Sequence, residues 1–96
     1  MSDVEVRDNP AAERYEAWLD GELAGIAVYE QRDGAIVFVH TEVDGKYGGR
    51  GIGSALARGA LDDVRAKGDR DVVAKCPFIK GWIEKHPDYQ DLLRRS

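Results

Sequence analysis

The feature that most constrains the fold is a change of hydrophobic period across a glycine-rich turn. Before the turn, Ile36–Val43 (I-V-F-V-H-T-E-V) is rich in β-branched residues and is typical of a strand. The turn itself, Tyr47–Gly53, reads Y-G-G-R-G-I-G, and we call it the glycine turn. After it, apolar residues recur every four positions, as on the buried side of a helix. These residues are Ile52, Leu56, Ala60 and Val64. A strand, a glycine turn and an amphipathic helix therefore follow one another directly.

Two hairpin turns predict three antiparallel strands in the first half of the chain. Asp20-Gly21 suits a tight turn between Tyr15–Leu19 and Leu23–Tyr29. Arg32-Asp33-Gly34 is a second turn, and it leads into the strand at Ile36–Val43. Residues 1–12 contain Asn9-Pro10 and are predicted to be an extended lead that ends in a turn.

The second half alternates helices with one strand. The amphipathic helix is expected to run to about Lys67, with Gly68 closing it. Asp71–Cys76 is a short apolar strand, and because a helix connects it to Ile36–Val43, the two strands should be parallel. Pro77 suits the first turn of a helix over Phe78–Lys85, which is followed by a last helical turn. We therefore predict one α/β (α+β) domain over residues 1–96. It has a mixed, mostly antiparallel sheet with packed helices, in the order β-β-β-α-β-α-α.

Charge and cysteine content narrow the function classes. The net charge of −4 argues against wholesale binding to nucleic acid or to an anionic membrane. A single cysteine, Cys76, allows no internal disulfide, and the start M-S-D-V-E lacks the basic and apolar regions of a signal peptide. The expected location is therefore cytoplasmic. No apolar run approaches the roughly 20 residues that cross a bilayer, and no metal site is predicted.

The glycine turn is suited to binding an anion. Glycines let successive backbone N–H groups converge, and the N-terminus of the following helix adds its dipole. The alternative is a loop that needs glycine only for its tight geometry. A nucleotide-binding P-loop is excluded because no Lys-Ser/Thr follows the glycines. A dinucleotide fold is excluded because antiparallel strands come first.

Three stretches carry a resemblance to a known family. They are His40–Val43 (H-T-E-V), Gly48–Leu56 (G-G-R-G-I-G-S-A-L) and Cys76–Tyr89 (C-P-F-I-K-G-W-I-E-K-H-P-D-Y). Together they resemble the GNAT superfamily of N-acetyltransferases, in particular its small YjdJ-type single-domain members. The second stretch is similar to the superfamily's Q/R-x-x-G-x-G/A acyl-CoA motif, and the third looks like a subfamily signature. One departure is Gly48, where the motif has Gln or Arg, and Arg50 is the candidate for a compensating charge.

The resemblance implies that acetyl-CoA is the donor and that two groups of residues bind it. The pyrophosphate would be held by the glycine turn and the start of the helix, at Gly49, Arg50, Gly51, Gly53 and Ser54. The pantetheine arm would lie against Thr41, Glu42 and Val43, and the Val43 N–H is a candidate to polarise the thioester carbonyl. Arg58 is either a contact for the 3′-phosphate or a solvated helix charge.

Three side chains are candidates for catalysis. Cys76 matches a cysteine of the signature, and the expected helix N-terminus beside it favours the thiolate form of a cysteine. It is either a covalent acyl relay or a wall of the pocket. His40 is a candidate general base, and by simple alternation it shares a strand face with Ile36 and Phe38. Glu42 lies two positions further on the same face and could act as base directly or through water.

The leading interpretation is an acyl-CoA-dependent N-acyltransferase acting on an amine, either a small molecule or a protein lysine or N-terminus. The alternative is a non-catalytic CoA or acyl-CoA-binding module, which gains weight because the chain is short for a GNAT enzyme. A third interpretation is an interaction domain that has lost the cofactor. Its direct support is Gly48, which stands where the acyl-CoA motif has Gln or Arg. The acceptor and the oligomeric state are left open by the sequence.

Overall fold

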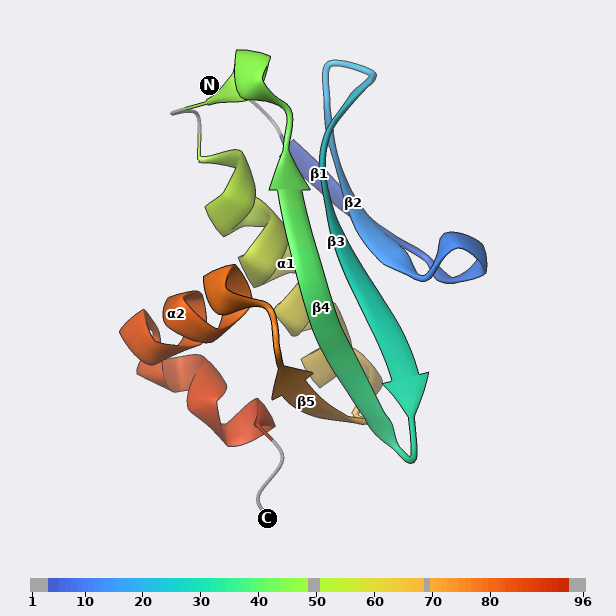
Figure 1. Cartoon of the computed structure of the whole chain (residues 1–96), viewed down its shortest axis with the longest axis vertical. Coiled ribbons are helices and arrows are strands. Elements are labelled where there is room, and N and C mark those ends of the chain that lie inside the picture. Colours follow the sequence, from blue (N-terminus) through green and yellow to red (C-terminus); the bar gives the residue numbers. More distant parts are fainter. Residues whose placement is uncertain (1–3, 49–50, 69, 94–96) are drawn as a thin grey trace.

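The sheet is built from five strands in chain order. The computed structural model describes residues 4–48, 51–68 and 70–93. The strands are β1 (Val4–Asn9), β2 (Arg14–Leu19), β3 (Glu22–Arg32), β4 (Ala35–Val43) and β5 (Asp71–Ala74). They lie side by side in the order β1-β2-β3-β4-β5, as Figure 1 shows. The first four strands pair antiparallel with one another, and β5 pairs parallel to β4. The predicted fold class, a mixed and mostly antiparallel sheet with packed helices, is confirmed.

Both predicted hairpin turns are confirmed. The backbone conformation of each turn explains why its residues could be recognised in the sequence. Asp20 and Gly21 have φ angles of 51° and 79°, and Asp33 and Gly34 have φ angles of 48° and 76°. A two-residue hairpin with positive φ at both central positions matches the right-handed twist of its flanking strands. Aspartate and glycine are among the residues that adopt this conformation most readily.

The predicted element order lacks one strand. Within the predicted lead, Val4–Asn9 forms β1 and a short 3₁₀ helix, Pro10–Ala12, follows it. Strand β1 pairs with β2 from Val4↔Leu19 to Asn9↔Arg14. Val4 and Val6 pack against the core, while the alternating charged residues Glu5 and Arg7 are exposed. A short edge strand with charges at alternate positions gives a weak apolar signal, so the sequence indicated only an extended segment. The last predicted helical turn is a 3₁₀ helix, Pro87–Leu92.

Two α-helices pack on one side of the sheet. Helix α1 (Ile52–Lys67) ends as predicted at Gly68, which has a φ of 66°, and α2 (Pro77–Lys85) follows β5. In Figure 1, α1 runs behind β4, and α2 lies next to it near β5. Their apolar residues form one core with alternate residues of the strands, and we call that side the core face and the opposite side the outer face. No helix in the described part of the chain is long and apolar enough to span a membrane.

The contact between α1 and β1 is unusually close. A Cβ atom built on Gly59 of α1 would lie 2.6 Å from the Cβ of Val6. At the C-terminal end of the helix, the Lys67 ammonium lies 3.0 Å from Asp8 and 2.9 Å from Asp63. Burial, and then hydrogen bonds to these carboxylates, raise the pKa of the Tyr15 and Tyr29 hydroxyls. This network fixes β1 and α1 against the sheet and leaves the opposite end of α1 for the site.

Candidate acyl-CoA site

The candidate site begins where β4 and β5 separate. Their parallel pairing runs from Ala35↔Asp71 to Phe38↔Ala74 and then stops. The Phe38 carbonyl accepts the N–H groups of both Lys75 and Cys76, at 3.0 and 2.8 Å, as the chain turns into α2. The predicted strand Asp71–Cys76 is therefore two residues shorter than expected. Beyond Phe38, β4 continues to Val43 with β3 on one side and, among the described residues, no strand on the other. We call this gap between β4 and the start of α2 the notch.

A bulge in β4 decides which side chains face which side of the notch. Tyr29 pairs with Phe38, but Val28 pairs with His40, so Val39 is an extra residue in β4. Beyond the bulge, Ala27 of the core pairs with Thr41. Because directly paired residues point to the same side of a sheet, Thr41 faces the core and His40 faces outward. The prediction that His40 shares a face with Ile36 and Phe38 is wrong, because the bulge reverses the alternation after Phe38.

On the core face, the structure brings Thr41 and Cys76 together. The Thr41 Oγ1 and Cys76 Sγ atoms are 3.2 Å apart, although the residues are 35 positions apart in sequence. The Cys76 side chain is buried, with 3% of its surface exposed, and it occupies the N-cap position of α2 ahead of Pro77. The thiol and the hydroxyl therefore form the wall of the notch on the core face.

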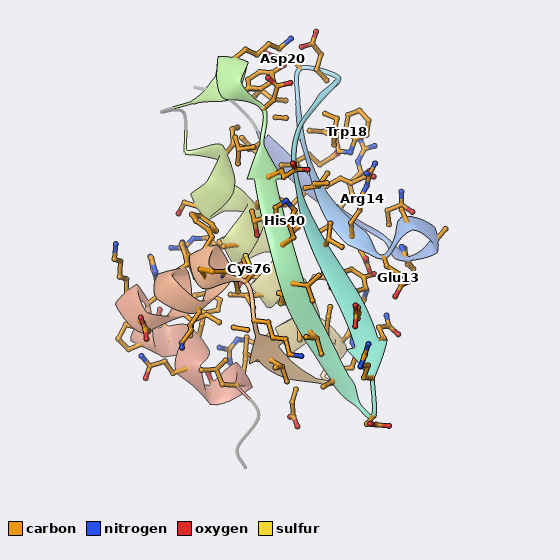
Figure 2. All side chains as sticks on the ribbon, viewed as in Figure 1. Glu13, Arg14, Trp18, Asp20, His40 and Cys76 are labelled. Carbon is orange, nitrogen blue, oxygen red and sulfur yellow. The ribbon has the colours of Figure 1, made fainter. Side chains whose placement is uncertain are left out.

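On the outer face, His40 and Glu42 form an exposed pair. His40 Nε2 lies 3.6 Å from Glu42 Oε1, and the two side chains are 59% and 66% exposed. His40 pairs with Val28 of β3, and Glu42 pairs with Ile26 of β3. Neither of these partners belongs to the core. Figure 2 shows His40 on β4 and Cys76 at the start of α2. The three catalytic candidates thus gather at one stretch of β4, but on opposite faces of the sheet.

Helix α1 begins beside the notch without a side-chain cap. Its N-cap residue, Gly51, has a left-handed backbone with φ of 74° and makes no capping hydrogen bond. The first intrahelical bond is donated by Ala55, so the N–H groups of the first turn have no partner within the helix. An uncapped first turn with a glycine N-cap suits an anion. Gly49 and Arg50, also predicted to bind the pyrophosphate, lie outside the described residues.

The segment that leads into the glycine turn is anchored to the β2–β3 hairpin. The Asp44 side chain accepts the Lys46 N–H at 3.1 Å, and the buried Tyr47 hydroxyl donates to Glu22. The Lys46 ammonium also contacts Glu22, at 2.8 Å, and these two hydrogen bonds lower the pKa of that carboxyl. Gly48 follows with φ of −55°, a backbone that any residue adopts. The backbone conformation therefore does not require glycine at position 48, where the acyl-CoA motif has Gln or Arg.

Helix α2 packs against the first turn of α1, which the sequence did not indicate. A Cβ atom on Gly53 would lie 2.8 Å from the Phe78 ring, and the Trp82 indole N–H donates to Ser54 Oγ at 3.0 Å. Arg58, one turn after Ser54, lies over the rings of Trp82 and Tyr89 with its guanidinium carbon 5.4 and 5.8 Å from their centres. The Arg58 side chain is therefore held more firmly than that of an arginine that is surrounded only by solvent.

Comparisons with known proteins agree with this geometry. The family model of the GCN5-related N-acetyl-transferases matches residues 14–92, so the chain belongs to that family. The solution structure of a GCN5-like candidate N-acetyltransferase from Staphylococcus aureus is similar, with a TM-score of 0.71 and 24% sequence identity. The match covers 100% of this chain and 93% of that one, and at this identity it shows the fold alone. No curated protein matches the chain significantly.

Proposed function

We propose that this chain is a small N-acyltransferase of the YjdJ type that transfers an acetyl group from acetyl-CoA to an amine. The observation that carries the proposal is the coincidence of three features around β4. Its pairing with β5 ends at Phe38, an uncapped helix begins beside it, and a bulge exposes the His40–Glu42 pair on the opposite face. Family membership supports a reaction of this class.

The residues at the notch fit coenzyme A. The first turn of α1, from Gly51 to Ser54, offers free N–H groups to a pyrophosphate. Gly49 and Arg50, which lie outside the described residues, would contribute to the same group, and Arg58 would contact the 3′-phosphate. On β4, the Asp44 N–H donates to Ala24 of β3, so the N–H of Val43 points the other way, into the notch. When bound, acetyl-CoA supplies an acetyl group activated as a thioester.

The two sides of β4 then have different roles. Thr41 and Cys76 wall the notch on the core face, and the Val43 N–H is a donor for a carbonyl oxygen. On the outer face, His40 accepts the proton of the incoming amine at Nδ1, because Nε2 faces Glu42. The carboxylate of Glu42, 3.6 Å from Nε2, orients the ring so that Nδ1 is left for the amine. The amine acceptor would therefore approach from the outer face and attack the thioester carbonyl directly. The carbon–sulfur bond would break, and coenzyme A would leave as its thiolate.

A covalent relay through Cys76 is less well supported by the surroundings of the thiol. A nucleophilic cysteine is activated by an adjacent base. Within the described part of the chain, the Cys76 side chain bonds the Thr41 hydroxyl, and the candidate bases His40 and Glu42 face the other side of the sheet. We therefore assign Cys76 to the pocket wall.

We expect the turnover of the Cys76→Ala variant to stay within about tenfold of that of the unmodified protein, because the variant loses a wall contact and not the attacking group. Steady-state kinetics with acetyl-CoA measures this, and intact-mass spectrometry after incubation with acetyl-CoA tests for an acetyl adduct. A loss of several orders of magnitude, together with a stable adduct on Cys76, would favour the relay.

The proposed function itself is tested by thermal unfolding with CoA. A ligand that binds only the folded state stabilises it by about 2.7 kcal/mol at 100 times its dissociation constant. For a domain of this size we expect a rise in melting temperature on the order of 10 °C. No rise at millimolar CoA would contradict the proposal. A rise without acetyl transfer to any of a broad panel of amines and proteins would leave the non-catalytic CoA-binding module as the better description.

A further inference from the structure

One face of α2 packs against the first turn of α1. Phe78 and Trp82 are four positions apart and so lie on the same side of α2. Phe78 covers Gly53, where the absence of a Cβ makes room for the ring, and the Trp82 indole bonds Ser54. Gly53 and Ser54 are the second and third residues of α1, where helical N–H groups have no intrahelical partner.

The Trp82 ring is held firmly by its surroundings. It is 6% exposed, and the His86 ring stacks on it with centroids 3.8 Å apart and planes 11° apart. His86 is itself fixed, because its Nδ1 bonds the Trp82 carbonyl at 2.7 Å. The Tyr89 ring meets Trp82 edge-on at 5.0 Å. The indole N–H therefore points at Ser54 from a fixed position.

The hydrogen bond from Trp82 determines what the Ser54 hydroxyl can do. An indole N–H is only a donor, so Ser54 Oγ accepts and its own proton remains available. In the first turns of a helix, a serine hydroxyl without such a partner is free to bond nearby backbone groups instead. With Trp82 occupying one lone pair, the hydroxyl keeps its proton for another acceptor, and hydrogen bonds to charged acceptors are the strong ones.

We propose that Trp82 is a positioning residue for coenzyme A, which acts through Ser54 to orient a hydroxyl donor toward the pyrophosphate. This inference rests on the proposed function, because it assumes that the first turn of α1 binds the pyrophosphate. It assigns α2 a part in phosphate binding, besides its packing and the position of Cys76.

The test compares Trp82→Phe with Trp18→Phe. The first change keeps an aromatic ring in the core and removes the N–H that reaches Ser54. The second removes the N–H of the other tryptophan, which bonds Glu16 on the outer face, and is the matched control. By isothermal titration we expect CoA to bind Trp82→Phe about three- to tenfold more weakly, the loss of one hydrogen bond, and to bind Trp18→Phe unchanged.

Two further measurements separate positioning from general damage. Ser54→Ala leaves the core intact and should weaken CoA binding at least as much, while adding Trp82→Phe to it should bring little further loss. Pantetheine, which has no pyrophosphate, should bind Trp82→Phe and the unmodified protein equally in an NMR titration that reaches millimolar dissociation constants.

Several outcomes would overturn the inference. Unchanged CoA binding by Trp82→Phe would do so, as would losses that simply add in the double variant or an equal loss for pantetheine. Each of these leaves the proposed function intact, because the unmodified protein still binds CoA. Failure of the unmodified protein to bind CoA would instead remove the proposed function and this inference together.

Discussion

His40→Ala is expected to lower kcat by about 100- to 10,000-fold, the range that a positioned general base contributes, and to leave CoA affinity unchanged. The imidazole lies on the outer face beside the notch, next to the carboxylate of Glu42. Removing it takes away the proposed acceptor of the amine proton but touches neither the first turn of α1 nor the wall formed by Thr41 and Cys76. Initial rates with acetyl-CoA and a reactive amine give kcat, and isothermal titration gives the CoA dissociation constant.

Two glutamates on the outer face, Glu42 and Glu30, provide a further test of this prediction and its control. Glu42→Gln should lower kcat because it removes the carboxylate that orients the His40 ring. Glu30→Gln makes the same change at a residue whose carboxylate pairs with Arg32 at the far end of β3, and it should leave kcat unchanged. Full activity in His40→Ala, combined with loss of activity in Cys76→Ala, would show that the amine does not attack by the direct route.

Much of the fold could be predicted because its signals are local. The turn at Asp20-Gly21 needs left-handed backbone at two successive residues, and the dipeptide itself supplies it. The apolar stripe that begins at Ile52 and the glycine at position 68 mark both ends of α1 within one segment of sequence. The parallel pairing of β4 with β5 followed from a general rule on crossover connections.

The faces of β4 could not be predicted, because a bulge has no dependable local signal here. Val39 is β-branched and fits a regular strand as well as a bulged one. One extra residue nonetheless reverses every later side chain, which moves His40 to the outer face and Thr41 to the core face. The candidate residues could be named from motifs in the sequence, while their division between the two faces of β4 required the pairing register.

Contacts between distant segments were also beyond the sequence. Trp82 and Ser54 are 28 positions apart, and nothing in either segment indicates that an indole N–H meets a serine hydroxyl at the start of α1. The same holds for Glu22, which contacts Tyr47 and Lys46 from the turn between β2 and β3. These contacts depend on how α2 and the β2–β3 turn pack, and tertiary packing is not encoded in any single stretch.

Gly59→Ala is expected to destabilise the fold by about 2–3 kcal/mol, although alanine is the better helix former. A new Cβ at this position would lie 2.6 Å from Val6 Cβ and 2.8 and 2.9 Å from its two methyl carbons. The β-branched Val6 side chain cannot rotate away from all three contacts, so α1 or β1 has to shift. Urea unfolding measures the free energy directly, and the melting temperature should fall by about 10 °C or more.

Gly81→Ala is the matched control, because it makes the same substitution in a helix where the new atom meets nothing. No atom lies within 4 Å of a Cβ built on Gly81 of α2, so the variant should gain about 0.5–1 kcal/mol from the lower flexibility of its unfolded chain. Opposite signs in the two variants would locate the effect in the contact between α1 and β1. If Gly59→Ala were as stable as Gly81→Ala, β1 would have to shift away from the new methyl group at little cost in free energy. In that case, the network of Lys67, Asp8 and Asp63 would not hold the edge strand rigidly against the helix whose other end forms the site.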